Sequence, residues 1–159
     1  MRINRSVIFT TALLCTALAL AVTAAAADQH SGTWKMNPAK SKYSPGPAPK
    51  STAVKVEADE KGVKIDAEIV NADGSPTHVQ YDAKFDGKDY PVTGVGYADA
   101  VSVKRVDANT IEATMKKGGQ VTMVVTTKLS EDGKTRTSTF KGKDAEGHVV
   151  HNVVVSDKQ

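Results

Sequence analysis

Apolar and polar residues alternate along most of the chain after residue 30, and many of the apolar positions hold β-branched side chains. A period of two is typical of strands that bury one face, and no helical period of 3.6 competes with it in this part of the chain. The alternation predicts an all-β protein with ten strands. They span residues 31–36, 51–58, 63–70, 77–85, 88–93, 99–106, 110–116, 120–130, 134–143 and 148–156.

Short polar links rich in Asp, Asn and Gly separate these strands. Sequential strands with short links predict an antiparallel up-and-down meander, and a meander of this length removes its exposed edges by closing into a β-barrel. A β-sandwich shares the strand rhythm and stays the alternative, although only residues 37–50 are long enough for the crossover that it needs. Asp86 and Gly87 favour a two-residue type I′ turn between the fourth and fifth strands.

Residues 37–50 follow the first strand and contain Pro45, Pro47 and Pro49. Three prolines at alternate positions exclude a helix there. An extended, proline-rich strap that runs over the outside of the barrel is expected instead.

The links also predict which side chains face inward, because cross-strand partners share one face of a sheet. Counting across the links puts Val56 opposite Ile65, Val101 opposite Met115, and Met115 opposite Val121, so one apolar lining continues from strand to strand. The same counting turns a second group inward: Tyr81, Arg105, Thr127, Arg136, Ser138, Phe140, Val149, His151, Val153 and Val155. Buried arginines are costly unless they are paired, so two of them predict a binding site in the interior.

The first 27 residues match a targeting segment. Arg2 and Arg5 precede an apolar run over residues 7–22, and small residues follow it. We expect a cleavable signal peptide, cut after Ala27, that leaves residues 28–159 as a single domain in the periplasm or outside the cell. An uncleaved membrane anchor is the alternative, but the apolar run is shorter than the ~20 residues that a membrane span requires.

The expected mature chain has no cysteine, which excludes disulfides, thiolate metal sites and a cysteine nucleophile. Without Arg2 and Arg5, the 21 basic residues fall to 19, against 18 acidic ones. The two signs alternate and aromatic residues are few, so no nucleic-acid surface is indicated. His148 and His151 would point to opposite faces of a strand, so neither a metal site nor a cofactor is expected. His30 and His78 are expected at the surface.

The opening segment GTWKMN, residues 32–37, resembles the Gly-x-Trp strand that begins the lipocalins and the fatty-acid-binding proteins, together called calycins. The resemblance implies an up-and-down barrel in which Trp34 plugs one end beneath an arginine from a late strand. That arginine would be Arg136 or, as the alternative, Arg105. It also implies that inward Arg136, Arg105 or His151 holds a ligand carboxylate.

The chain departs from both groups. The Thr-Asp-Tyr motif of lipocalins is missing, and the proline-rich strap stands where fatty-acid-binding proteins have two helices.

Together these features predict a monomer that reversibly binds a small amphipathic or anionic molecule inside the barrel. The expected lining residues are Tyr81, Arg105, Arg136, Phe140 and His151. One alternative is a structural or interaction protein with a filled barrel and no ligand. Another is a small hydrolase or isomerase that uses Ser138 and His151. No inward carboxylate accompanies that pair, so we do not expect an enzyme.

Overall fold

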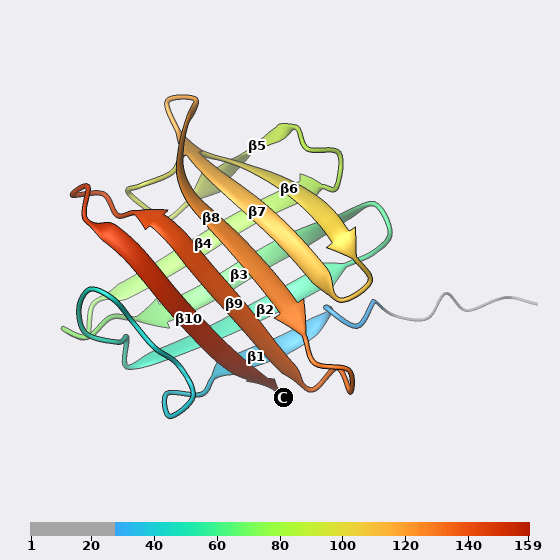
Figure 1. Cartoon of the computed structure of the whole chain (residues 1–159), viewed down its shortest axis with the longest axis horizontal. Coiled ribbons are helices and arrows are strands. Elements are labelled where there is room, and N and C mark those ends of the chain that lie inside the picture. The colour runs from blue at the N-terminus through green and yellow to red at the C-terminus, as the bar shows by residue number, and fades with distance from the viewer. Residues whose placement is uncertain (1–27) are drawn as a thin grey trace, which may run out of the picture.

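The computed structural model describes residues 28–159, so the predicted signal peptide lies outside the described residues. Ten strands and no helix are present in this range (Figure 1). They are β1 (Gly32–Met36), β2 (Ser51–Ala58), β3 (Gly62–Val70), β4 (Pro76–Lys84), β5 (Asp89–Thr93), β6 (Ala100–Asp107), β7 (Thr110–Lys117), β8 (Gln120–Leu129), β9 (Thr135–Lys143) and β10 (Val149–Lys158). From residue 28 onward, no helix has the length and apolar character that crossing a membrane requires.

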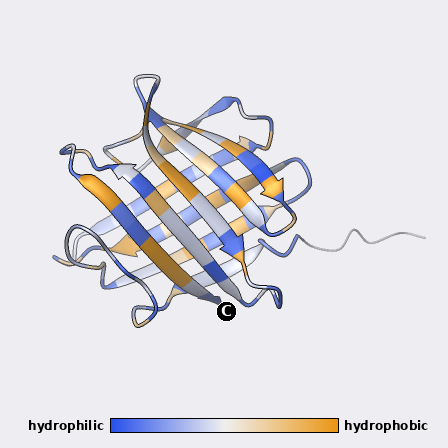
Figure 2. Cartoon of the chain, in the orientation of Figure 1, coloured by the Kyte–Doolittle hydropathy of each residue, from blue (hydrophilic) through white to orange (hydrophobic). Residues whose placement is uncertain are grey.

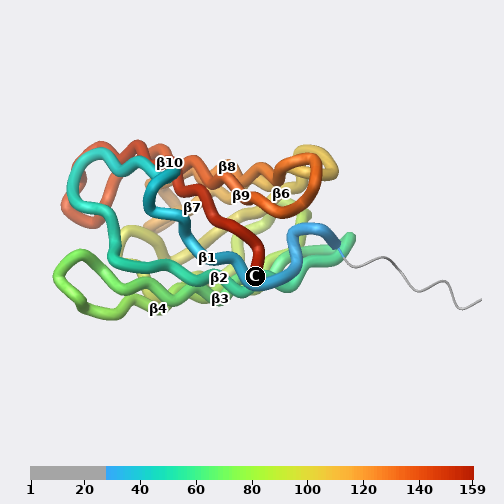
Figure 3. The backbone as a smooth tube through the Cα atoms, turned by 90° about the horizontal axis from the view of Figure 1, so that it is seen from below, coloured from blue at the N-terminus to red at the C-terminus, as the bar shows by residue number. Residues whose placement is uncertain are grey.

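The strands join in sequence order, each antiparallel to the next, and β1 pairs with β10 to close the sheet. The predicted closed meander is therefore confirmed, and the sandwich alternative is wrong. Seen from below, β1–β4 form one layer and β6–β10 the other, so the barrel is flattened (Figure 3). Hydrophobic and hydrophilic residues alternate along the strands (Figure 2), as a sheet with one buried face requires.

Most of the predicted register is confirmed. Val56 lies opposite Ile65, and Tyr81 opposite Val92. The expected type I′ turn between β4 and β5 is wrong, because Asp86 does not have the positive φ that this turn demands at both central residues. The strands stop at Lys84 and resume at Asp89, which leaves a four-residue loop.

A bulge at Thr122 in β8 changes one predicted pair. The register shifts between Met115 and Lys116, so Met123 rather than Val121 lies opposite Met115. An extra residue in one strand moves the following side chains to the other face. Met123 is accordingly buried, whereas Val121 is 59% exposed.

The inward face of β10 is also displaced from the prediction. Five residues, 144–148, separate β9 from β10 and place Asn152 opposite Phe140. A shift of one residue exchanges the two faces of a strand. The side chains that line the interior are therefore Val150, Asn152, Val154 and Ser156. Those of Val149, His151, Val153 and Val155 take the opposite face.

The strap, residues 37–50, does more than wrap the outside as expected. β1 is only five residues long and leaves much of the β10 edge unpaired. The strap occupies that edge: the Lys42 amide donates to the Val153 carbonyl at 2.7 Å, and the Val153 amide donates back at 2.8 Å. Tyr43, Pro47 and Pro49 then line the interior. The strap thus completes the seam of the barrel and forms part of its wall.

Gly94, just after β5, lies close to the backbone of β4, and this close approach can be tested. A Cβ at Gly94 would lie 1.8 Å from the carbonyl oxygen of His78, whereas a Cβ at Gly87 would meet no atom within 4 Å. Both glycines have positive φ, at 88° and 71°. Gly87→Ala should therefore cost only the left-handed backbone penalty of about 1 kcal/mol. Gly94→Ala should cost about 3 kcal/mol, because β4 must also move.

Urea unfolding of both variants, followed by circular dichroism, measures this difference. Equal losses of unfolding free energy would contradict the close approach of Gly94 to β4.

Candidate functional site

The barrel encloses a cavity of about 590 Å³. Its apolar wall comes mainly from β2, β3 and β4. The residues of that wall are Val54, Val56, Val63, Ile65, Ala67, Ile69 and Val79. A second hollow of about 640 Å³, here called the strap hollow, adjoins it beneath Tyr43, Pro47 and Pro49. The two spaces share Arg136, Ser138 and Phe140. Volumes of this size are those of small-molecule sites.

Arg136 projects from β9 into both spaces. Within residues 28–159, no carboxylate lies within ion-pair distance of its guanidinium, and no described group hydrogen-bonds to it. Burial lowers the pKa of Arg136, and the neighbouring Tyr81 opposes that shift. An arginine keeps its proton even so. The interior therefore contains a positive charge without a counter-ion.

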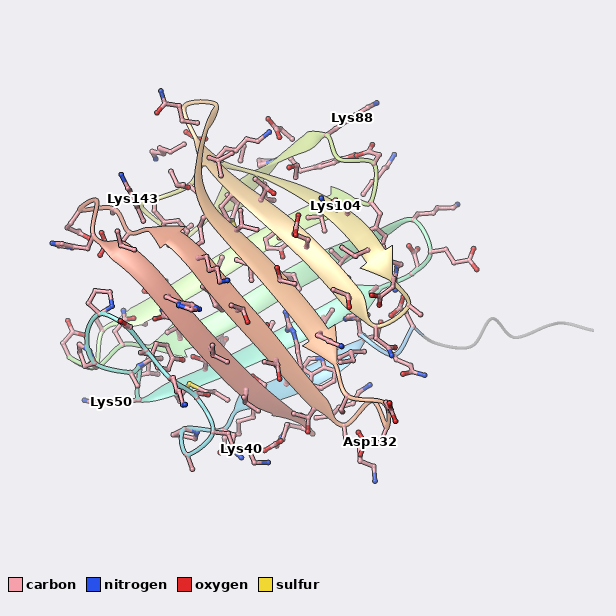
Figure 4. All side chains as sticks on the ribbon, viewed as in Figure 1. Lys40, Lys50, Lys88, Lys104, Asp132 and Lys143 are labelled. Carbon is pink, nitrogen blue, oxygen red and sulfur yellow. The ribbon has the colours of Figure 1, made fainter. Side chains whose placement is uncertain are left out.

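No lysine of residues 28–159 lines the cavity or the strap hollow. Lys40, Lys50, Lys88 and Lys143 are seen around the periphery of the barrel (Figure 4), and the side chain of Lys104 is exposed. Charges in solvent are screened, whereas a charge in the low-dielectric interior is felt strongly. Arg136 accordingly dominates the electrostatics of the cavity.

Tyr81 and Tyr97 accompany Arg136 at the cavity. Burial raises the pKa of Tyr81 to about 12; the nearby guanidinium of Arg136 opposes the rise and Tyr97 adds to it. Burial also raises the pKa of Tyr97. Both phenols stay protonated at neutral pH, so they can donate hydrogen bonds to an anion beside Arg136.

Hydroxyl groups extend this polar region along β8, β9 and β10. The Oγ1 of Thr127 and the Oγ of Ser138 are buried and lie 2.9 Å apart. Ser156 is buried as well and stands opposite Arg136 on the neighbouring strand. One layer of the barrel is therefore polar at the site, and the layer formed by β2–β4 is apolar.

Trp34 is fully buried and lines neither space, and its Nε1 donates a hydrogen bond to the His30 carbonyl at 2.9 Å. The cation expected over its ring was Arg136 or Arg105. The cation present is Lys158, whose Nζ lies 5.1 Å from the centre of the ring. Lys158 is the partner of Trp34 in the β1–β10 pairing, so both side chains share a face.

Arg105 does not line either space, contrary to the prediction. It forms an ion pair with Asp28, donates to the Asp59 carbonyl at 3.2 Å, and lies over the ring of Phe85 at 4.6 Å. These contacts hold its guanidinium at the end of the barrel. Arg105 therefore ties the segment before β1 to that end.

His30 was expected at the surface and is instead 2% exposed and part of the cavity wall. No alternation pattern covers the residues before β1, so this burial could not be predicted from the sequence. Desolvation lowers the pKa of His30 to about 4; Asp28 opposes the shift, and Arg105 adds to it. The imidazole is therefore neutral at pH 7. Its Nε2 is buried without a hydrogen-bond partner among the described residues.

His151 lies on the outer face of β10 and is exposed, so its predicted place in the lining is wrong. Ser138, its supposed partner in a hydrolase, hydrogen-bonds with Thr127 instead. The Ser138–His151 pair does not form.

Asp144, Glu146 and His148 in the β9–β10 link have potential metal-ligand atoms within 4.8 Å of one another. The Oδ1 of Asp144 accepts hydrogen bonds from the backbone amides of Glu146 and His148, at 3.1 and 2.8 Å. Its Oδ2 lies 3.0 Å from Nδ1 of His148. Turn geometry accounts for this grouping, and we assign no metal to it.

Tyr81, Arg136 and Phe140, three of the five predicted lining residues, lie together on the cavity wall. Their part in binding stays a prediction.

Comparisons with known proteins add the following. No family model matches the chain, and no curated protein sequence matches it. Among solved structures, the chain is similar to zebrafish ileal bile acid-binding protein complexed with cholic acid. The identity is 11%, the TM-score is 0.49, and the match covers 82% of this chain and 99% of that one. The strand order and closure of the sheet are those of an antiparallel up-and-down barrel.

The buried imidazole makes stability depend on pH. The pKa of His30 is about 4 in the folded chain against 6.5 for an unperturbed histidine. Between these values the unfolded chain binds a proton that the folded chain does not, so stability falls as the pH drops from 6.5 towards 4. The loss from this group should reach roughly 3 kcal/mol below pH 4.

His30→Gln should flatten the dependence of the unfolding free energy on pH across this window. Urea unfolding at several pH values, on both proteins, provides the measurement. Parallel curves for the wild type and the variant would show that His30 is not buried as described.

Proposed function

We propose that this protein reversibly binds a small amphipathic molecule with a single negative charge inside its barrel. The observation that carries the proposal is the guanidinium of Arg136, which faces a cavity of about 590 Å³ with no carboxylate of the described residues beside it. Burial of an unpaired charge costs several kcal/mol. A bound anion offsets that cost, and a merely structural arginine would not incur it.

The charge of the ligand follows from the charges close to Arg136. Arg136 contributes one positive charge, and His30 contributes none at pH 7 because burial holds its pKa at about 4. Asp144 and Glu146 also line the cavity, but they belong to the link after β9, at the far end of that strand from Arg136. A monoanion neutralises the guanidinium, whereas a dianion would leave one negative charge buried and unpaired. Carboxylates also match the planar fork of arginine donors.

The shape and polarity of the walls support an amphipathic body. Tyr81 and Ser138 can donate hydrogen bonds near the charged group. The valines, isoleucines and alanines of β2–β4 contact the rest of the molecule. Such a wall, mostly apolar with a few convergent polar groups, is usual for small-molecule sites.

The filled-barrel alternative fits less well, because a binding site calls for a cavity of at least ~300 Å³ and this interior exceeds that volume. The hydrolase alternative loses its base with the outward placement of His151.

We further propose that the protein is exported to the periplasm or the medium and acts there as a monomer. The support for export is the charged start, apolar run and small residues within residues 1–27. A cut after Ala27 would retain Asp28, whose carboxylate pairs with Arg105 at the end of the barrel.

Export predicts a defined mass. Protein recovered from the periplasm or the medium of the expressing cell should have the mass of residues 28–159 and begin at Asp28. Intact-mass spectrometry with amino-terminal sequencing checks this. A chain that keeps residues 1–27 and stays with the cell membrane would contradict the proposal.

Ligand binding by the wild-type protein can be tested with a panel of fatty acids and aromatic acids in thermal unfolding. A ligand at a hundred times its dissociation constant should stabilise the protein by about 2.7 kcal/mol. An absence of any shift across the panel would contradict the proposed function.

The role of Arg136 predicts a distinct pattern among three variants. Arg136→Gln should weaken binding of a carboxylate such as palmitate by roughly ten- to a hundredfold, because it removes a charge-assisted hydrogen bond. Arg136→Lys should retain part of the affinity, since it keeps the positive charge but lacks the paired N–H donors of the planar guanidinium. Lys141→Gln makes the same change of charge on the outer face of β9 and should leave affinity unchanged.

Isothermal titration calorimetry with palmitate and with the uncharged hexadecanol provides the readout. Hexadecanol should bind the wild type and Arg136→Gln alike. The unfolding free energy of Arg136→Gln should equal or exceed that of the wild type, because the variant no longer buries an unpaired charge. A variant that unfolds easily and binds palmitate normally would mark Arg136 as structural.

A further inference from the structure

The strap hollow contains the side-chain amide of Asn152, whose oxygen has a hydrogen-bond partner and whose nitrogen has none among the described residues. Asn152 projects inward from β10 and lines this hollow together with Arg136, Ser138 and Ser156. Its Oδ1 accepts a hydrogen bond from the backbone amide of Ser44 in the strap, at 2.9 Å. The Nδ2 group has no hydrogen-bond partner among residues 28–159.

The contact with Ser44 fixes the orientation of the side chain. A backbone N–H can only donate, so the amide atom facing Ser44 must be the oxygen. The two N–H donors of Nδ2 therefore lie in the same amide plane, on the side of Cγ away from Ser44. The position of Asn152 is held by the strand as well, since it lies opposite Phe140 in the β9–β10 pairing.

The spacing along β10 relates this donor to the charged group. Ser156 lies opposite Arg136, and Asn152 lies four residues before Ser156 on the same face of β10. At about 3.3 Å per residue, Asn152 stands about 13 Å along the strand from the level of Arg136. Val154 and Ser138 lie at the level between them, and Phe140 stands opposite Asn152. The donor on Asn152 and the charge on Arg136 are thus at two separate levels of the lining.

We propose that Asn152 is a second recognition residue, whose Nδ2 donates a hydrogen bond to an uncharged oxygen of the ligand in the strap hollow. This inference rests on the proposed function and narrows its substrate class. The ligand is an oxygenated monoanionic amphiphile: its charged end pairs with Arg136, and a carbonyl or hydroxyl oxygen further along its body meets Asn152. A plain hydrocarbon acid fills the same space and leaves Nδ2 without a partner.

The same amide connects the ligand to the strap. The Ser44 carbonyl accepts a hydrogen bond from the backbone amide of His151 at 2.7 Å, and Lys42 pairs with Val153 beside it. A ligand oxygen that accepts a hydrogen bond from Nδ2 would order the Asn152 side chain. The Oδ1 of the same side chain accepts the hydrogen bond from the Ser44 amide of the strap. Binding of the oxygenated ligand should therefore protect this part of the strap more than binding of the plain acid does.

The experiment compares palmitate with a set of oxopalmitates that carry one ketone at successive positions from mid-chain to the methyl end. A ketone accepts hydrogen bonds and donates none, so it reports on a donor in the wall. The wild type should bind at least one isomer three- to tenfold more tightly than palmitate, as one added hydrogen bond provides. Calorimetry measures the affinities, and amide hydrogen exchange at residues 42–44 measures the protection of the strap.

Two variants assign the preference to Asn152. Asn152→Leu removes donor and acceptor and should abolish the preference for the ketone while palmitate affinity stays within about twofold of the wild type. Asn152→Asp keeps an oxygen for the Ser44 amide but has no donor, and the ratio of the two affinities should fall to about one. Thr139→Val, which removes a hydroxyl from the outer face of β9, is the control and should keep the full preference.

Each other outcome overturns the inference. If no ketone isomer binds the wild type better than palmitate, Asn152 meets no ligand oxygen. If Asn152→Leu weakens both ligands equally, the residue acts through the strap alone, and a ketone preference that survives in Asn152→Asp also excludes donation from Nδ2. Failure of the proposed function is distinguishable from all of these, because neither palmitate nor any oxopalmitate would then bind the wild type.

Discussion

The seam between β10 and the amino-terminal part of the chain decides whether this protein has an interior. β1 pairs with β10 through only three residues, Trp34 to Met36, and the remaining edge of β10 is covered by the strap. Without this seam, the sheet would have two open edges, and the inward side chains of β9 and β10 would face solvent. Arg136 and Asn152 belong to those side chains. The environment of both residues therefore depends on main-chain hydrogen bonds made more than a hundred residues earlier in the sequence.

The positions of the strands could be predicted because alternation and turn residues are local signals. The inward face of most strands could be predicted as well. Residues paired across two strands share a face of the sheet, so the inward-facing alternate residues of one strand determine those of the next. That is why Tyr81, Arg136 and Phe140 were placed correctly on the wall. Parity is also where the prediction failed, since one unforeseen residue in a bulge or link reverses it. The bulge at Thr122 and the five-residue link before β10 each did so.

The ends of the barrel could not be predicted from alternation at all. Arg105 has the parity of an inward residue, but its position at the end of β6 brings it to Asp28 rather than to the cavity. His30 precedes the first strand, so no periodic pattern describes its environment, and its burial follows from a tertiary contact with Trp34. Lys158 replaced the expected arginine over Trp34 because of the β1–β10 register, which joins opposite ends of the chain. Contacts of this kind arise from closure of the sheet.

Arg105 and Arg136 also differ in how their charges are balanced. At the plugged end, Arg105 has the carboxylate of Asp28 and the ring of Phe85, so its charge is compensated within the protein. Arg136 projects from β9 of the same sheet into the cavity, and the described chain provides it with no counter-ion. The chain has acidic residues in abundance, yet near Arg136 it places phenols and hydroxyls, which lower the cost of the charge without neutralising it. A protein that pairs Arg105 at the end of the barrel and leaves Arg136 facing a cavity separates a structural cation from one that is free to meet a ligand, and that contrast is the strongest physical reason to regard the cavity as a binding site.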